Sequence, residues 1–185
     1  MSLSLDYAVA SEPVYARPAR RDERDLTADS RCICSDCEER QRAFCSALPT
    51  AALKDLAAAR QKLTLAPRDA LFEQGEPADY AFIVTAGSVK IYSLLPDGRC
   101  VVHGFASPGD HLGLAVNGAY AYFAAALTPV TVCRFESKEI ERLCDRYSGV
   151  ARRLLCSTND ELVVAQNQVL TLGRKTAVGK VASFL

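Results

Sequence analysis

Residues Tyr80–Tyr92 have the sequence YAFIVTAGSVKIY, with an apolar run on each side of a short turn. In Val89–Tyr92, apolar and polar side chains alternate, which is the period of a half-buried strand. Between the two runs, Ala86–Ser88 supplies the small residues that a tight turn favours. This stretch therefore predicts two consecutive strands joined by a turn.

The same pattern continues on both sides, from Leu63 to about Glu136. Asp97-Gly98 is a strong hairpin signal, and Pro108–Asp110 marks another turn. Many short strands at this spacing indicate a β-sandwich or jelly roll. Besides the two strands above, we expect strands at 62–65, 70–72, 100–105, 123–127 and 130–135.

Helical periodicity flanks the strands on both sides, so the fold class is α+β. Pro49–Arg60 has an apolar face, and Thr50 can cap it. Lys138–Arg146 is expected to form a second helix, with Ser137 as its cap. A longer helix is expected from Gly149 to Leu172, where the following glycine would end it.

The longer helix carries a dimerisation signal. Apolar and small residues recur at alternating steps of four and three, which is an a/d heptad seam. The alternative is a single amphipathic helix packed on its own domain. The sustained spacing favours a parallel two-helix seam in a homodimer, which the small residues would keep marginal, as a switch requires. The seam residues are Ala151, Leu155, Thr158, Leu162, Ala165, Val169 and Leu172.

Composition narrows the class of protein. The chain has 185 residues, of which 49% are hydrophobic, so global disorder is excluded. Lys and Arg together number 22, as do Asp and Glu, without the basic excess typical of a DNA-binding module. No apolar run is long enough to span a membrane, and the N-terminus lacks a signal-peptide pattern, so we expect a cytoplasmic protein without a membrane partner. The sequence lacks a nucleophile elbow and a phosphate loop, and no enzyme activity is expected.

Four of the eight cysteines fall close together, at Cys32, Cys34, Cys37 and Cys45. In the cytosol, clustered thiols indicate metal or redox chemistry more often than disulfides. Thiolates bind both zinc and iron–sulfur clusters, so the spacing leaves both open, together with unliganded thiols. The remaining four cysteines are isolated, and an isolated cysteine is usually a small buried hydrophobic residue. That interpretation is kept for Cys100, Cys144 and Cys156.

Four segments resemble the CRP/FNR superfamily of transcription regulators, and within it the FNR branch. They are Arg68–Glu76, Ile83–Tyr92, Gly104–Phe105 and Pro108–Gly113. The resemblance covers about residues 34–185. It implies a cyclic-nucleotide-binding-like β jelly roll with flanking helices and a long C-terminal dimerisation helix.

The resemblance to the FNR branch also assigns the cysteines. Cys34, Cys37 and Cys45 match the three cysteines that precede the barrel, and Cys133 matches the fourth, inside it. This implies a [4Fe–4S] cluster whose loss under oxygen weakens the dimer. Cys32 is an additional cysteine, which leaves open whether it replaces Cys34 as a ligand.

The cyclic-AMP-binding branch uses a glutamate and an Arg-Ser pair to hold the phosphate. The corresponding segment, Leu114–Phe123, contains no acid and no arginine. A buried phosphate without such donors is poorly stabilised. We therefore expect no cyclic AMP binding, and we expect Tyr120, Tyr122 and Phe123 to fill the ancestral pocket.

The family's winged helix–turn–helix is expected after the dimerisation helix. Thr176 can cap a new helix from Ala177, and Lys175–Leu185 resembles the first helix of that domain. The resemblance thus implies a chain that lacks most of the DNA-reading domain, with DNA and RNA polymerase as partners of the full-length form only. The expected divisions are a flexible tail at 1–31, a cysteine loop at 32–48, the jelly roll at 49–148, the dimerisation helix at 149–172 and the start of the truncated domain at 173–185.

Two other functions stay open. One is a structural zinc protein that acts as a dimerisation partner without binding DNA. The other is a regulator of the same superfamily that senses haem or nitric oxide. His103 and His111 are the only histidines, and a lone histidine in a β-rich domain is more often a satisfied polar or core residue than a haem ligand.

Overall fold

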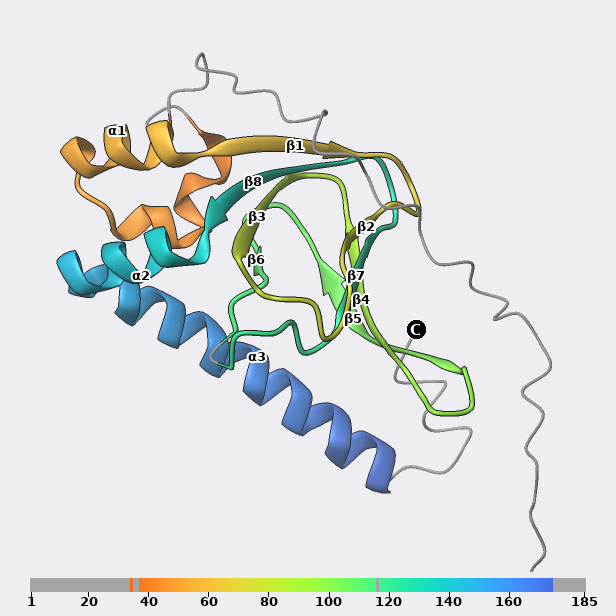
Figure 1. Cartoon of the computed structure of the whole chain (residues 1–185). Coiled ribbons are helices and arrows are strands. Elements are labelled where there is room, and N and C mark those ends of the chain that lie inside the picture. Colours follow the sequence, from red (N-terminus) through yellow and green to blue (C-terminus); the bar gives the residue numbers. More distant parts are fainter. Residues whose placement is uncertain (1–33, 35–36, 116, 175–185) are drawn as a thin grey trace, which may run out of the picture.

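The computed structural model describes residues 34, 37–115 and 117–174. The tail at 1–31, Cys32 and the helix expected after Thr176 lie outside these residues. The strands of the described part form two antiparallel sheets that face each other as a jelly roll (Figure 1). The expected α+β jelly roll is therefore confirmed.

Each sheet has four strands, and the chain crosses repeatedly between the sheets. The first sheet has the order β1 (Gln61–Leu65), β8 (Val130–Glu136), β3 (Tyr80–Ala86) and β6 (His111–Leu112). The second has the order β2 (Ala70–Phe72), β7 (Phe123–Ala126), β4 (Val89–Leu94) and β5 (Cys100–Ala106). The sequence patterns predicted all of these strands except β6, whose two residues are too few to show a period.

The turn between β3 and β4 explains why the two runs of the opening stretch separate into different sheets. Gly87 has a φ of +83°, in the left-handed region that glycine tolerates best. A Cβ at this position would also collide with the carbonyl oxygen of Pro129. After this turn Val89 and Tyr92 are buried, while Lys90 and Ile91 are only partly so.

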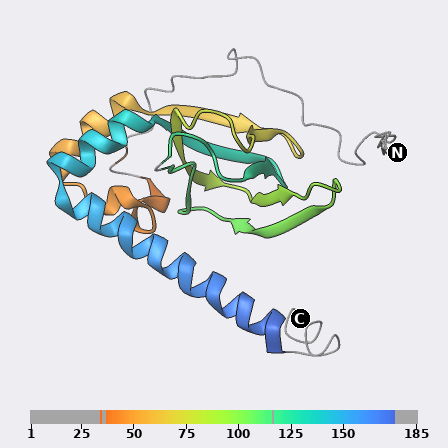
Figure 2. The ribbon, with the colours of Figure 1, turned by 60° about the horizontal axis from the view of Figure 1, so that its bottom comes forward.

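The helices gather at one end of the barrel (Figures 1 and 2). They are the 3₁₀ helices η3 (Glu38–Gln41) and η4 (Phe44–Ala47), followed by α1 (Thr50–Ala59), α2 (Ser137–Arg146) and α3 (Ser148–Arg174). Figure 2 shows α3 leaving this end as a long rod.

Three sequence-based details of the helices were wrong. Pro49 and Glu136 occupy the N-cap positions of α1 and α2, and neither helix has a side-chain cap. Thr50 is already inside α1, and Ser137 instead donates a hydrogen bond from Oγ to the carbonyl of Ala78, at 2.7 Å. Helix α3 continues through the glycine expected to end it, since glycine inside a helix costs only about 1 kcal/mol relative to alanine.

Two separate cores hold the domain together. One lies inside the barrel, between the sheets, and contains Phe72, Val84 and Val132 among others. The other lies between the outer face of the first sheet and the helices, and it includes Leu56, Phe135 and Leu143. We call the second one the helical core, because η4, α1, α2 and α3 all contribute residues to it.

Candidate functional site

The N-terminal cysteines lie on a segment that folds as two short 3₁₀ helices. Cys37 is the N-cap residue of η3, and Cys45 lies within η4. Phe44 anchors η4, because its ring meets that of Phe135 edge-on with 6.2 Å between the ring centroids. With Phe44 held in this way, Cys45 is carried into the helical core and is only 9% exposed.

The distant cysteine, Cys133, reaches the same core from the barrel. Strand β8 lies between the two cores, and alternate side chains of a strand point to opposite faces. Val132 accordingly faces the barrel interior, while Cys133 and Phe135 belong to the helical core. Cys133 pairs in the sheet with Ile83 of β3, which also faces that core.

Three of the four candidate ligands meet in or against the helical core, and Cys37 lies close enough to affect Cys45 and Cys133 electrostatically. Cys45 and Cys133 share the helical core, and Cys34 packs against it. Burial, opposed by a backbone hydrogen bond and aided by the nearby Cys37, Cys34 and Cys133, raises the pKa of the Cys45 thiol to about 12. Burial also raises the pKa of Cys133 to about 11, against the lowering effect of the Arg60 guanidinium, whose Nη1 lies 4.0 Å from its sulfur.

The cysteines have the right chemistry to bind a metal, but their sulfur atoms are not arranged as a coordination site. Within the described part of the chain, no group of three or more His, Cys, Asp or Glu side chains is arranged to hold a metal ion. The donors are nonetheless of the right kind, because thiolates bind iron–sulfur clusters and zinc, and a bound metal keeps a buried thiol deprotonated. Binding of one metal centre by these sulfurs would require η3 and η4 to move.

The other cysteines differ from one another. Cys144 on α2 is partly buried and packs against the helical core, and Cys100 at the start of β5 is partly buried. Cys156 is exposed on α3, so its interpretation as a buried hydrophobic residue was wrong. The reason is that α3 leaves the domain, so no neighbouring element covers that face.

The segment that would hold a cyclic nucleotide phosphate is occupied by aromatic packing. Tyr120 stacks on Phe72 with 4.0 Å between the ring centroids, and its hydroxyl donates a hydrogen bond to the Tyr80 carbonyl at 2.9 Å. Tyr122 also packs against the barrel core. Phe123 instead stacks on Tyr92, with 5.2 Å between the centroids. The side chain of Tyr120 thus lies between the sheets, as expected.

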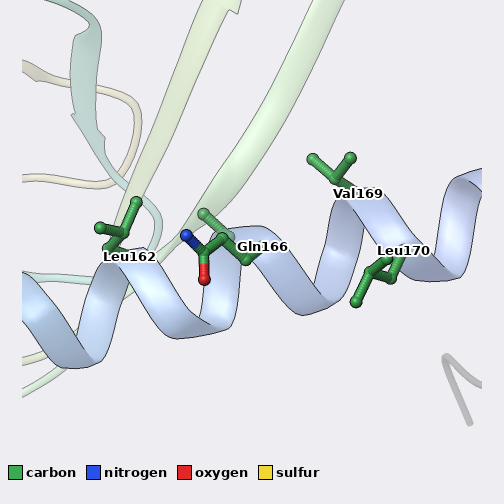
Figure 3. A pocket seen from close by; sticks show the side chains of 5 residues that line it. Leu162, Gln166, Val169 and Leu170 are labelled. Atoms are coloured by element: carbon green, nitrogen blue, oxygen red, sulfur yellow. The ribbon is translucent and has the colours of Figure 1, made fainter.

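Helix α3 presents a long apolar surface. Three of the predicted seam residues, Leu155, Leu162 and Val169, are 71%, 53% and 69% exposed. Figure 3 shows Leu162 and Val169 projecting on the same side of the helix, where they help to line a hollow. Exposed patches of this kind mark interaction sites. The smaller seam residues Ala151, Thr158 and Ala165 are exposed too, while the side chain of Leu172 lies outside the described residues.

The apolar surface is wider than the predicted seam. Val163, Val164 and Leu170 lie off the seam and are also about half exposed. The heptad spacing did not indicate this second stripe. Although α3 is long, no helix in the described ranges is apolar enough over sufficient length to cross a bilayer.

Comparisons with known proteins agree with this architecture. Residues 62–147 match the family described as the cyclic nucleotide-binding domain. The chain is 37% identical over 149 residues to the transcriptional activatory protein AadR of Rhodopseudomonas palustris, covering 80% of this chain and 62% of AadR. It is 34% identical over 153 residues to the nitrogen fixation regulation protein FixK of Bradyrhizobium diazoefficiens, covering 83% of this chain and 65% of FixK.

A solved structure gives the same result. The structure of FixK2 from Bradyrhizobium japonicum is 33% identical, with a TM-score of 0.63 over 68% of this chain and 63% of that one. The chain is thus similar to these regulators in both sequence and fold. The chain resembles proteins that are named as regulators and not as enzymes. It spans less than two thirds of the length of these relatives.

Proposed function

We propose that this chain is the sensory and dimerisation part of an oxygen- or redox-responsive transcription regulator. In this proposal Cys34, Cys37, Cys45 and Cys133 hold a [4Fe–4S] cluster. The observation that carries it is the meeting of Cys45, from the N-terminal segment, with Cys133, from the barrel, in one core. That core also contains Val150, from the start of α3.

The protein's own residues define what such a site can do. A bound cluster would supply an oxygen-labile link between the N-terminal segment and β8. Phe44 and Leu48 are buried beside Cys45 and limit the access of water. Val150 is fully buried in the same core, so a shift of η4 changes the support of α3.

The proposed output is a change in the monomer–dimer equilibrium. Pairing of two α3 helices would cover the seam from Ala151 to Leu172 in a symmetric homodimer. In a full-length regulator, such a dimer places two recognition helices at neighbouring half-sites of DNA, where RNA polymerase is the further partner. The proposal includes no membrane and no cyclic AMP, because Leu114–Phe123 has neither the acid nor the arginine to bind a cyclic phosphate.

A structural zinc site on the same cysteines is the second candidate, since four thiolates suit zinc equally well. A haem site has less support. His103 is exposed, and its Nε2 makes a 2.8 Å hydrogen bond with Ser93. Burial lowers the pKa of His111, and the groups that act on it electrostatically are the carboxylates of Glu161 and Asp110, which are not usual haem ligands.

Anaerobic reconstitution with ferrous iron and sulfide tests the proposal. The measurements are visible absorption and the iron, sulfide and zinc content per chain. We expect about four iron atoms per chain in the wild type and in the control C156A, whose cysteine is exposed on α3. C45A and C133A should lose most of the iron while keeping the wild-type circular dichroism. A colourless protein with stoichiometric zinc would contradict the cluster, and unchanged iron in C133A would contradict the ligand assignment.

A further inference from the structure

Arg42, in the segment between η3 and η4, is held on one side by the barrel. Gly109, in the turn between β5 and β6, has a φ of +99° and lies directly against it. A Cβ at Gly109 would lie 2.5 Å from the Cβ of Arg42 and 3.1 Å from its Cδ. The cysteine segment and this turn therefore touch so closely that only glycine fits.

On its other side, Arg42 is held by α3. Nη2 of Arg153 donates a hydrogen bond to the carbonyl oxygen of Arg42, at 3.2 Å. The same turns of α3 pack on η4, because Val150 belongs to the helical core and a Cβ at Gly149 would meet Ala47 at about 3.5 Å. Arg42 thus lies where the barrel, the cysteine segment and α3 meet.

The position of the Arg42 carbonyl depends on the fold of the cysteine segment. The backbone N–H of Arg42 closes η3 by donating to Glu39, at 3.1 Å. The segment between Cys37 and Cys45 is short, so drawing the two sulfurs together moves the peptide that α3 contacts. Farther along, α3 exposes its apolar surface. Because α3 extends from this base as a long rod (Figure 2), a small change of direction at the base is amplified along its length.

We infer that Arg153 is a positioning residue that couples the cysteine site to the dimerisation helix through the Arg42 carbonyl. The inference rests on the proposed function, since it concerns how the binding of a metal at the cysteines changes the position of α3. Arg153 contacts the backbone of the segment that carries the cysteines, through its hydrogen bond to the Arg42 carbonyl. Through this bond, a change in the conformation of the cysteine segment moves α3.

The test is the ratio of the dimer dissociation constants of metal-free and metal-loaded protein, measured anaerobically by sedimentation. Coupling energies between sites commonly correspond to about 5- to 150-fold, and we expect a wild-type ratio in that range. R153A should reduce the ratio to nearly one while its iron content stays at the wild-type value. R153K, which keeps a donor, should restore part of it.

Arg152 provides the matched control, because it is the adjacent residue, has the same charge and is exposed. R152A can shift both constants through charge, but it should leave their ratio unchanged. G109A perturbs the same contact from the barrel side, without touching a cysteine or Arg153, and should also lower the ratio. In metal-free protein, R153A and not R152A should speed hydrogen exchange of the amides at 38–47.

The outcomes separate the two proposals. A wild-type ratio well above one, with R153A equal to R152A, would overturn the role of Arg153 and leave the proposed function standing. A wild-type ratio of one in iron-loaded protein would overturn both. Loss of iron in R153A would show that the residue serves the site itself, which would also overturn the coupling role.

Discussion

Truncation of Leu162 to alanine is expected to weaken the homodimer. Complete burial of a leucine side chain contributes about 1.5–3 kcal/mol. Because Leu162 is 53% exposed in the monomer, pairing can bury roughly half of that side chain in each copy. The two copies together contribute about 2 kcal/mol, or roughly 30-fold in the dissociation constant.

The assay is sedimentation equilibrium of metal-loaded L162A under anaerobic conditions. V164A is the matched control, since Val164 is similarly exposed, at 57%, on the same helix but off the seam. V164A should change the dimer dissociation constant by only a few-fold. Equal weakening by both substitutions would show that the dimer does not use the heptad seam, and no weakening by L162A would show that α3 is not the interface.

Three further predictions concern the stability of the barrel. G113A should lower the melting temperature by several degrees, because Gly113 has a φ of +80° and a Cβ there would lie 2.8 Å from the Tyr80 carbonyl oxygen; an unchanged melting temperature would contradict this close packing. Y120F removes the hydroxyl donor to that carbonyl and should cost about 1 kcal/mol in urea unfolding, whereas a more stable variant would refute the bond. Burial lowers the pKa of His111 in the folded protein. As the pH falls below about 6.5, the unfolded chain therefore binds the proton before the folded protein does, and the free energy of unfolding should decrease. H111Q should flatten this decrease while H103Q should not, and parallel pH profiles of H111Q and wild type would refute it.

The barrel could be predicted from sequence because its signals are local. The alternation at Val89–Tyr92, the glycine turn before it and the Asp97-Gly98 hairpin each act within a few residues, and the structure contains all of them. Likewise, the heptad spacing predicted the long helix, which begins one residue before the expected Gly149. The helix caps failed because Pro49 and Glu136 hold the N-cap positions, and the Ser137 hydroxyl finds a distant carbonyl instead.

The site was predicted only as a set of residue types. Spacing identified the cluster of Cys32, Cys34, Cys37 and Cys45, whereas family resemblance selected three of these as ligands. The partner Cys133 also came from family resemblance, since its approach depends on how β8 lies against the helical core. The contact of Arg153 with the Arg42 carbonyl spans 111 positions and has no sequence signature. The packing of Gly109 on Arg42 has no sequence signature either, because the sequence indicates only that a glycine lies in a turn.

The measurement that tests the central claim most directly is sedimentation of one reconstituted sample before and after the admission of air, with iron counted in both states. The account predicts an iron-loaded dimer that loses iron and dissociates to monomers, while C133A sediments as a monomer throughout. An identical distribution of monomer and dimer in the loaded and aerated states, despite loss of iron, would contradict the claim that the cysteine site controls the pairing of α3.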